Sequence, residues 1–336
     1  MILVTGGTGL VGSHLLYHLA LLNDPILAIY RSEEKIKSTR KVFSYYTDKS
    51  DLLFDKIQWI KADITDIPSL NKVFSHSITK VYHCAALVSF DPKDYKKMRR
   101  VNIDGTANIV NFCIDHNVER LCFVSSIAAV GDSINGQFIN EENELIDTGN
   151  QHGYAITKYG AEMEVWRGSQ EGITVAIVNP GVILGSGFWH EGSGKLFTQA
   201  YNNFKFYTEG VTGFVSVNDV VKAMISLINS NIDNERFILV SENKSFKEIL
   251  TEIALTFGKK APSIKVGKFI TELTWRFDWL LTKLTGKTPL LTKNSARSSH
   301  HKSYYSSEKI QKALNFEFTS ISLSINSICE DYKKEM

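Results

Sequence analysis

Cysteine, proline and long hydrophobic runs are all scarce in this sequence. The four cysteines among 336 residues form no Cys-x-x-Cys pair and have no histidine at zinc-ligand spacing, which argues against a disulfide framework and against a metal site. Six prolines and 22% charged residues are typical of a folded globular chain without extended disorder. No apolar run is as long as a membrane span, and the first residues lack the pattern of a secretory signal, so we expect a cytoplasmic protein.

The chain also lacks an excess of charge of either sign. Its 38 Lys and Arg residues nearly balance 36 Asp and Glu residues, and the net charge of +2 gives no reason to expect a nucleic-acid partner. Hydrophobic residues make up 43% of the chain, which at this length is enough to bury a substantial core in one large domain or two smaller ones.

Short apolar runs alternate with amphipathic segments over the first half of the chain. This alternation predicts an α/β fold of the Rossmann type, in which helices cover both faces of a doubly wound parallel sheet. The runs are nearly continuous in Val, Ile and Leu, as expected for strands buried on both faces. We expect strands at residues 2–4, 26–30, 57–61, 80–83, 120–124 and 173–178, and helices at residues 10–22, 67–76, 98–116 and 154–168.

This alternation of apolar runs and amphipathic segments ends after residue 178, in a glycine-rich stretch. A strand at 214–217, a helix at 218–230 and a strand at 236–240 then look like a return to the domain that contains the sheet. We therefore expect a sheet domain formed by residues 1–178 and 214–242, and a smaller, mostly helical substrate lobe formed by residues 179–213 and 243–336. Ligands of open α/β sheets bind beyond the carboxyl ends of the strands, which predicts a substrate site between the two parts.

A glycine-rich turn joins the first expected strand to the first expected helix. Glycines at three-residue intervals permit a tight turn and close approach of the backbone to a pyrophosphate, and the helix N-terminus favours negative charge. Because the turn directly follows an N-terminal strand, nucleotide binding is favoured over a generic loop. The expected contacts are Thr5, Gly6, Gly9, Leu10, Val11 and Gly12.

The next three strand ends carry further candidate nucleotide contacts. Arg31 stands where an acidic residue would bind the ribose hydroxyls of NAD, and its guanidinium suits the 2′-phosphate of NADP, so we expect NADP and leave NAD open. Asp63, beside Ile64, can accept a hydrogen bond from the adenine amino group. Ala85 and Ala86 are small enough to let a cofactor lie close, although each of these residues also fits plain turn chemistry or packing.

Tyr154 and Lys158 are four residues apart on an expected helix, so both side chains project from one face. A phenol is a poor acid or base near neutral pH, but a nearby ammonium group and a positive nicotinamide ring favour its anion. We expect Tyr154 to exchange a proton with the substrate oxygen as hydride moves, and Lys158 to bind the nicotinamide ribose. Ser126, which follows Ser125 at the end of the fifth strand, can offer its hydroxyl to the same oxygen.

Taken together, these motifs resemble the extended short-chain dehydrogenase/reductase family. The glycine turn, the serine pair, Tyr-x-x-x-Lys and an Asn-Pro-Gly segment occur in the family's order over residues 1–240. The resemblance implies that Pro180, Gly181 and Val182 contact the cofactor. It also implies that Asn102 holds the active-site helix and a proton-relay water, while a helix-interior Asn bonded to backbone is an equally good interpretation of that residue.

The residues after Ser126 distinguish between branches of this family. Dehydratases carry an acidic pair beside the catalytic hydroxyl, and Ile127 and Ala128 stand there instead, which argues against a dehydratase. We favour an NADP-dependent oxidoreductase that interconverts a carbonyl and an alcohol on a small apolar molecule, similar to dihydroflavonol reductases and 3β-hydroxysteroid dehydrogenases. A nucleotide-sugar epimerase with tightly bound NAD stays open. A non-catalytic NADP-binding regulator is a further alternative, against which the retained Ser126, Tyr154 and Lys158 argue.

The expected substrate lobe contains an amphipathic segment at residues 268–286. Its apolar residues fall at helical spacing, and we expect them to close an apolar pocket: Phe269, Ile270, Leu273, Phe277, Leu280, Leu281 and Leu284. With Trp275, Trp279 and nearby basic residues, the same helix could lie on a membrane surface, which is the less favoured interpretation. We expect Phe90, Trp189 and His190 to border the substrate, and a homodimer stays open.

Overall fold

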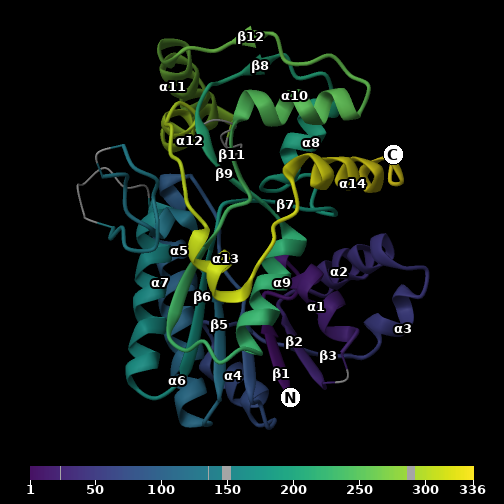
Figure 1. The fold of residues 1–336 in the computed structure, drawn as a ribbon, viewed down its shortest axis with the longest axis vertical. Helices are drawn as coiled ribbons and strands as arrows, with labels where there is room; N and C mark the ends of the chain where they lie inside the picture. Colours follow the sequence, from purple (N-terminus) through teal and green to yellow (C-terminus); the bar gives the residue numbers. More distant parts are fainter. Residues whose placement is uncertain (23, 135, 146–152, 286–291) are drawn as a thin grey trace.

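A seven-stranded parallel sheet lies at the centre of the molecule (Figure 1). The computed structural model describes residues 1–22, 24–134, 136–145, 153–285 and 292–336. Every neighbouring pair of strands in this sheet is parallel, which confirms the predicted doubly wound α/β fold. In spatial order the strands are β3 (Ile57–Lys61), β2 (Ile26–Tyr30), β1 (Ile2–Thr5), β4 (Lys80–His83), β5 (Arg120–Val124), β6 (Thr174–Pro180) and β10 (Glu235–Leu239).

Apolar side chains cover both faces of this sheet, which explains why its strands are nearly continuous hydrophobic runs. Alternate residues of β1 point to opposite faces: Val4 joins a core that includes Leu15, and Leu3 joins a second core that includes Val110. Helices α1 (Leu10–Ala20), α2 (Glu33–Tyr46), α3 (Ser50–Phe54), α9 (Val217–Ile228) and α13 (Glu308–Leu314) contribute to the first core, and α4 (Ile67–Phe74), α6 (Gly105–Asp115) and α7 (Gly153–Gln170) to the second.

The six strands predicted for the first half of the chain lie within two residues of their expected bounds. The helix expected at residues 98–116 is divided. It begins with the short helix α5 (Tyr95–Met98), continues as a π-helical segment, η2 (Arg99–Asp104), and becomes regular only in α6. A π-helical turn is rare and often marks a functional site. This one contains Asn102.

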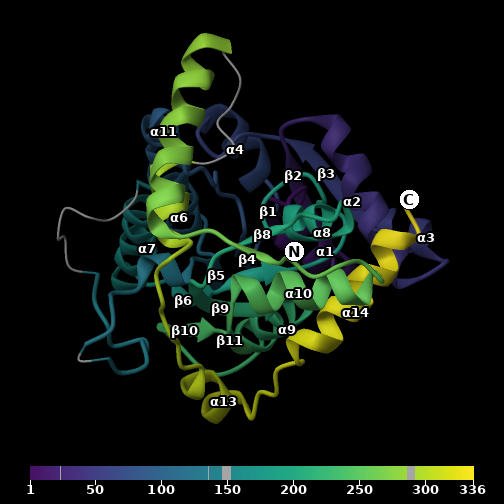
Figure 2. The same cartoon turned by 90° about the horizontal axis from the view of Figure 1, so that it is seen from above.

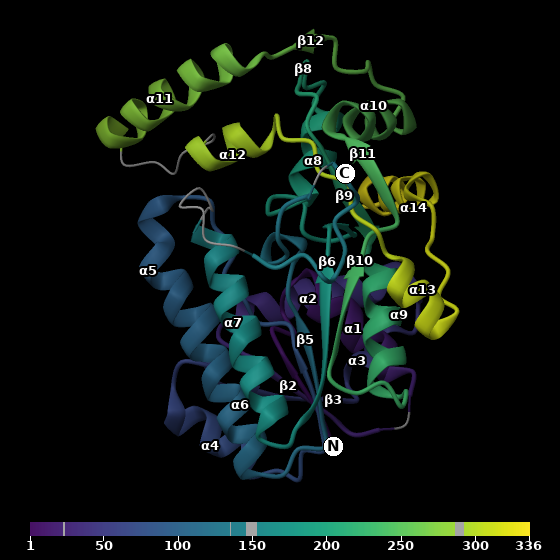
Figure 3. The ribbon, with the colours of Figure 1, turned by 60° about the vertical axis from the view of Figure 1, so that its left-hand side comes forward.

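Much of the chain after β6, apart from α9, β10 and α13, forms a second region beyond the carboxyl ends of the main strands (Figures 1 and 3). The strand expected at residues 214–217 is present as part of a longer strand, and it pairs outside the main sheet. A side chain on Gly181 would place its Cβ 2.4 Å from the Gly213 carbonyl oxygen, so the glycine allows the chain to turn closely against the incoming strand. A separate sheet results, made of β7 (Val182–Leu184), β9 (Val211–Ser216) and β11 (Glu242–Ser245), and a further pair joins β8 (Phe206–Tyr207) to β12 (Ile264–Lys265).

Helices α8 (Gly194–Tyr201), α10 (Phe246–Thr256) and α14 (Ile321–Lys333) enclose a third hydrophobic core in this region. Trp189 packs in that core against Phe197 and Tyr332, with ring centroids 6.2 and 4.9 Å away. Two further helices, α11 (Lys268–Thr285) and α12 (Lys293–Ser298), lie beside each other, and α11 extends outwards from the rest of the chain (Figures 2 and 3).

The prediction that α11 closes an apolar pocket is wrong for five of its residues. The side of the helix that faces the protein is the one that carries Thr271 and Thr282, so the apolar side faces solvent. The side chains of Leu280 and Leu284 lie outside the described part of the structure. Within the described residues, no helix is both long and apolar enough to cross a membrane. The exposed residues are Phe269, Ile270, Leu273, Phe277 and Leu281.

Candidate active site

The glycine turn lies at the carboxyl end of β1, where the strand order reverses between β1 and β4. Gly6 has a φ of 67°, and a Cβ there would lie 2.6 Å from the Ala85 backbone nitrogen. A Cβ on Gly12 would lie 2.2 Å from the Gly6 carbonyl oxygen. Both glycines are therefore required for the turn to fold against the loop after β4 and against helix α1.

The N-terminus of α1 is suited to hold a pyrophosphate. Its N-cap residue is Gly9, no side chain caps it, and the first turn contains no acidic residue. A Cβ on Gly9 would meet only the Gly6 carbonyl oxygen, at an ordinary 3.5 Å, so the space over the turn is open. Backbone N–H groups and the positive end of the helix dipole would face a bound anion here. The turn thus fits a dinucleotide, with Leu10 and Val11 in the first helical turn.

Arg31 and Asp63 face each other at the neighbouring ends of β2 and β3. The Arg31 Nη1 atom lies 3.9 Å from Asp63 Oδ2, and both side chains are exposed to solvent. The other Asp63 oxygen accepts hydrogen bonds from the backbone and hydroxyl of Thr65, both at 2.9 Å. Ile64 is buried against Gly105. Arg31 is therefore accessible to a ligand, whereas Asp63 also stabilises its own turn.

Thr5 lies beneath the turn in a buried chain of hydrogen bonds that includes His83. The Thr106 hydroxyl donates to the Asn102 carbonyl, so it accepts from His83 Nε2 at 3.0 Å, and His83 Nδ1 accepts from the Thr5 hydroxyl at 2.6 Å. Burial lowers the pKa of His83 to about 3, which keeps the ring neutral as this arrangement requires. The glycine turn and the π-helical segment are thereby joined through one histidine side chain.

Tyr154 lies near the start of α7, and Ser126 lies at the end of β5. The two side chains are hydrogen bonded to each other; burial raises the pKa of Tyr154 to about 12, and the bond to Ser126 opposes this shift. The Ser126 hydroxyl oxygen also accepts from the Ala128 backbone N–H at 3.1 Å, which fixes its orientation. The structure thus brings together the two hydroxyl groups that the sequence predicted to meet one substrate oxygen.

Lys158 follows Tyr154 by one helical turn and is almost fully buried. Its ammonium group donates to the Val124 carbonyl at 2.7 Å and lies 4.2 Å from the centroid of the Phe123 ring. Burial lowers the pKa of Lys158 to about 7, and the carboxylate of Glu162 opposes this shift. The charge on Lys158 is therefore sensitive to its surroundings near neutral pH.

Glu162, one further turn along α7, is a residue that the sequence analysis missed. Its fully buried carboxylate accepts from the Ser125 hydroxyl at 2.7 Å, from Asn179 Nδ2 at 3.0 Å and from Arg236 Nη1 at 3.1 Å. It therefore connects α7 to β5, β6 and β10. The spacing of Tyr154, Lys158 and Glu162 at four-residue intervals is the signal that could have identified it. The Oδ1 atom of Asn179, beside Pro180, is buried with no hydrogen-bond partner among the described residues.

Asn102 connects the start of α7 to the loop after β4. Its side chain accepts from the Leu87 backbone N–H at 2.7 Å and donates to the Leu87 carbonyl and to the Thr157 hydroxyl, both at 3.0 Å. That hydroxyl donates in turn to the Tyr154 carbonyl at 2.9 Å. The position of Tyr154 along the site therefore depends on Asn102.

The segment after β6 runs beside the site. Pro180 is the last residue of β6 and is buried, and the Gly181 backbone N–H donates to the Leu239 carbonyl at 3.0 Å. Val182 is half-buried at the start of β7. Ala85, which follows β4, donates its backbone N–H to the Thr5 hydroxyl at 3.2 Å, and Ala86 is next to it in the chain. These residues surround the carboxyl ends of β1, β4 and β6.

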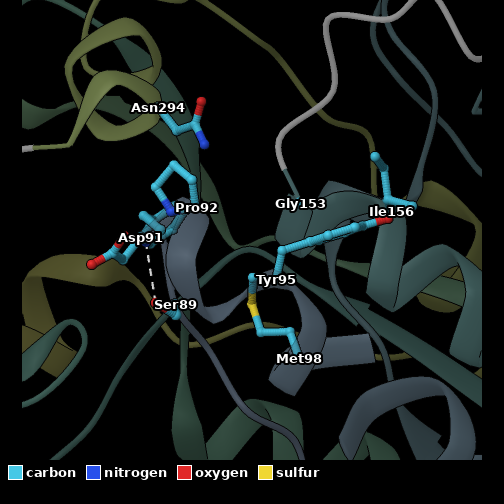
Figure 4. Close-up of a pocket in the computed structure, with 9 residues that line it drawn as sticks. Ser89, Asp91, Pro92, Tyr95, Met98, Gly153, Ile156 and Asn294 are labelled. Carbon is cyan, nitrogen blue, oxygen red and sulfur yellow. Dashed lines mark hydrogen bonds between the residues drawn. The ribbon is translucent and has the colours of Figure 1, made fainter. Parts of the chain in front are cut away.

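A pocket of about 370 Å³ is lined in part by the start of α7, the segment of the chain that includes Tyr154 (Figure 4). Gly153 and Ile156 belong to its lining, and the ring centroids of Phe90 and Tyr154 are 6.1 Å apart. Of the three residues expected at the substrate, only Phe90 lies here, since Trp189 is part of the third core and His190 is exposed. The pocket is lined by Ser89, Phe90, Asp91, Pro92, Tyr95, Met98, Gly153, Ile156 and Asn294.

Comparison with known proteins agrees with this architecture. The chain is 25% identical over 329 residues to a putative dihydroflavonol 4-reductase of Synechocystis sp., which covers 95% of this chain and 90% of the relative. It is 30% identical over 278 residues to anthocyanidin reductase of Arabidopsis thaliana, covering 73% and 77%. The fold is similar to a crystal structure of UDP-glucose 4-epimerase from Thermotoga maritima with UDP-glucose, with a TM-score of 0.77, 19% identity and 99% coverage of both chains.

The family match itself spans most of the chain. The NAD dependent epimerase/dehydratase family matches residues 2–239, which include the glycine turn, Ser126, Tyr154 and Lys158. The match runs from β1 to the end of β10 and so covers the whole main sheet. This chain therefore belongs to the NAD dependent epimerase/dehydratase family, as an NAD(P)-dependent enzyme with the fold of the extended short-chain dehydrogenases/reductases.

Proposed function

We propose that this chain is an NADP-dependent oxidoreductase that interconverts a carbonyl and an alcohol on a small apolar molecule. The observation that carries the proposal is the hydrogen-bonded pair of Tyr154 and Ser126 beside the pocket. The short turn after Ser126 consists of Ile127, Ala128 and Ala129, which have no carboxylate to assist elimination of water. Carbonyl reduction needs the two hydroxyl groups and no third acid or base.

Ser126, Tyr154 and Lys158 each have a different role in the proposed reaction. NADP, when bound, supplies the hydride or accepts it. The Ser126 hydroxyl binds the carbonyl oxygen of the substrate and orients it toward Tyr154. Tyr154 gives its phenolic proton to that oxygen in reduction, and the raised pKa keeps the phenol protonated until negative charge develops there. Lys158, held by the Val124 carbonyl, contributes positive charge that stabilises the phenolate left behind.

The pocket supports an apolar substrate. Phe90, Pro92, Tyr95, Met98 and Ile156 contribute apolar surface, and Figure 4 shows Tyr95 extending toward Ile156. Among the described residues that line it, none is Lys or Arg, the side chains that would bind the diphosphate of a nucleotide sugar. Asn294 comes from the second region of the chain. We therefore keep the division into a nucleotide domain (1–178 and 214–242) and a substrate lobe (179–213 and 243–336) as part of the proposal.

The preference for NADP rests on Arg31. Its guanidinium is exposed at the end of β2 and is 3.9 Å from its carboxylate neighbour, a distance that leaves its N–H donors available to a phosphate. Ser32, the next residue, is the N-cap of α2, and its side chain does not cap that helix.

A nucleotide-sugar epimerase with tightly bound NAD is the second candidate. The likeness in fold to UDP-glucose 4-epimerase favours it, and Ser126, Tyr154 and Lys158 would serve that reaction as well. The two candidates differ in how they hold the cofactor. An epimerase oxidises and re-reduces its substrate with one retained NAD, whereas a reductase must exchange NADP at each turnover.

Mass spectrometry of the purified protein, followed by an NADPH-oxidation assay with a panel of aldehydes and ketones, tests the proposal. We expect exchangeable NADP and NADPH-dependent turnover that Tyr154→Phe abolishes. Retained NAD with no turnover of any carbonyl would overturn the proposal in favour of the epimerase. Turnover that persists unchanged in Tyr154→Phe would refute the assigned mechanism.

A further inference from the structure

Helix α11 presents its apolar side to solvent and its polar side to the protein. Thr271 and Thr282 are only 6% and 8% exposed, and the Thr271 hydroxyl lies 2.8 Å from His300 Nε2. A helix that packs only on its own chain has the opposite arrangement. The exposed apolar side chains fall within about one third of the helix circumference: Phe269 (77%), Ile270 (54%), Leu273 (54%), Phe277 (63%) and Leu281 (41%).

The chain around α11 is strongly basic. Residues 259–302 contain ten Lys and Arg residues against two acidic ones, Glu272 and Asp278, which is a net charge of +8. Because the whole chain has a net charge of +2, the remaining residues together carry −6. Although the whole chain is nearly neutral, it contains a basic segment at α11 and α12. Such a segment is attracted to an anionic surface.

Cations and the Trp279 indole ring border the exposed apolar side. The Lys283 ammonium group lies 4.1 Å from the Trp279 ring centroid, and the Arg276 guanidinium lies 4.6 Å from that of Trp275. Arg276 also pairs with Glu272. Aromatic rings with a polar edge, next to long basic side chains, are typical of helices that lie between lipid headgroups and acyl chains.

A basic depression of about 460 Å³ lies beside the start of α11. Its cationic residues are Lys265, Lys268 and Lys302, and Lys265 is paired with Glu209 in the same lining. His300 and His301 complete the polar side of the depression. Its position extends the basic border of the helix beyond its N-terminal end.

We propose that α11 attaches this protein to the surface of an anionic lipid bilayer. The five exposed apolar side chains enter the interfacial region, and the basic residues beside them remain among the headgroups. A second copy of the chain is a poorer occupant, because it would bring another segment of charge +8 against the first and the two would repel each other. A bilayer supplies apolar surface and negative charge together.

Attachment through α11 would bring the pocket beside Tyr154 close to the bilayer. Helix α12 packs against α11, and its Asn294 is part of the pocket lining. An apolar substrate dissolved in lipid could then enter from the membrane. This consequence rests on the proposed function, whereas attachment itself does not, so vesicle binding is measured without any substrate.

Cosedimentation of the full chain with lipid vesicles tests the proposal. We expect binding to vesicles of phosphatidylcholine and phosphatidylglycerol, weaker binding to phosphatidylcholine alone, and release at high salt. The double variant Phe269→Ser/Phe277→Ser should reduce the bound fraction by about tenfold or more, because both side chains lose apolar area that the bilayer would bury. Arg276→Gln/Lys283→Gln should reduce the preference for phosphatidylglycerol.

Leu255→Ser/Leu323→Ser is the matched control. These leucines are as exposed as Phe277, at 62% and 63%, but lie on α10 and α14, so this variant should bind vesicles as the unmodified chain does. Tryptophan emission of the unmodified chain should shift to shorter wavelength with phosphatidylglycerol vesicles. Absence of vesicle binding and of that shift would overturn the proposal. So would an equal loss in the control, or a dimer that Phe269→Ser/Phe277→Ser dissociates while vesicles have no effect.

Discussion

Helices α7 and α11 have the same length, 18 residues, and depart from the usual pattern of burial in opposite ways. Helix α7 buries charged side chains, Lys158 and Glu162, whereas α11 exposes large apolar ones. Buried charges and exposed apolar patches are the observations that call for an explanation in a folded protein. In α7 the explanation is inside the molecule, because each charge has a hydrogen-bond partner there. In α11 the explanation has to come from outside.

The largest effect that the comparison predicts is at Tyr154, on the face of α7 that we propose meets the substrate. Tyr154→Phe removes the proton donor and retains the ring, so kcat should fall by about 10²-fold to 10⁴-fold. Circular dichroism and NADPH binding should be nearly unchanged. Steady-state NADPH oxidation at saturating carbonyl substrate measures the effect. A loss of less than about threefold would contradict proton transfer by Tyr154.

The buried carboxylate of α7 should have the next largest effect. Glu162→Gln leaves Arg236 without its ionic partner in the interior, and breaking a buried pair in this way costs about 3–5 kcal/mol. The free energy of unfolding, measured by urea denaturation, should fall by roughly that amount. The exposed pair of Lys312 and Glu308 is the control, since Glu308→Gln should cost at most about 1 kcal/mol.

Glu162→Gln should also move the pH dependence of activity. The Glu162 carboxylate raises the pKa of Lys158 against the effect of burial, so its removal should lower that pKa further below about 7. If the cationic form of Lys158 supports Tyr154, activity falls as pH rises through that pKa. The fall should therefore begin at lower pH in Glu162→Gln than in the unmodified enzyme. An unchanged profile of kcat/KM against pH would show that Glu162 has only a structural role.

Arg31 should act on the choice of cofactor and not on proton transfer by Tyr154. Arg31→Ala should weaken NADPH binding by about tenfold or more, because a charge-assisted contact to phosphate is lost, and should leave NADH binding within about twofold. Isothermal titration with both cofactors measures the difference. Equal losses for NADPH and NADH would mean that Arg31 acts on the shape of the nucleotide site as a whole.

The contrast between the two helices also explains what the sequence could predict. The strands of the main sheet were predicted because hydrophobic runs bounded by turn residues report burial directly. Tyr154 and Lys158 were predicted because they are close in sequence. Glu162 was missed because its partners, Ser125, Asn179 and Arg236, lie in or directly after three strands that only the fold brings together.

For α11, periodicity predicted an amphipathic helix correctly but not which side would face the protein. A hydrophobic pattern specifies that one side is apolar, and the identity of its environment depends on what the rest of the chain covers. Similarly, a strand was predicted at 214–217 but its pairing could not be, because the pairing with β7 depends on the close approach of Gly181 and Gly213.

The smallest effect is expected on the stability of α11, and it tests the comparison most directly. Leu273 and Phe277 are 54% and 63% exposed, so Leu273→Ser and Phe277→Ser each remove little buried apolar area. Each should change the free energy of unfolding by no more than about 0.5 kcal/mol, as surface substitutions do.

The matched substitution in the core, Ile253→Ser, should cost several times as much, because Ile253 is fully buried. A loss above about 2 kcal/mol in Phe277→Ser would mean that α11 packs its apolar side on its own chain, as the sequence had predicted. A negligible loss means that these side chains contribute little to the stability of the fold, and the explanation for α11 then lies outside the folded chain.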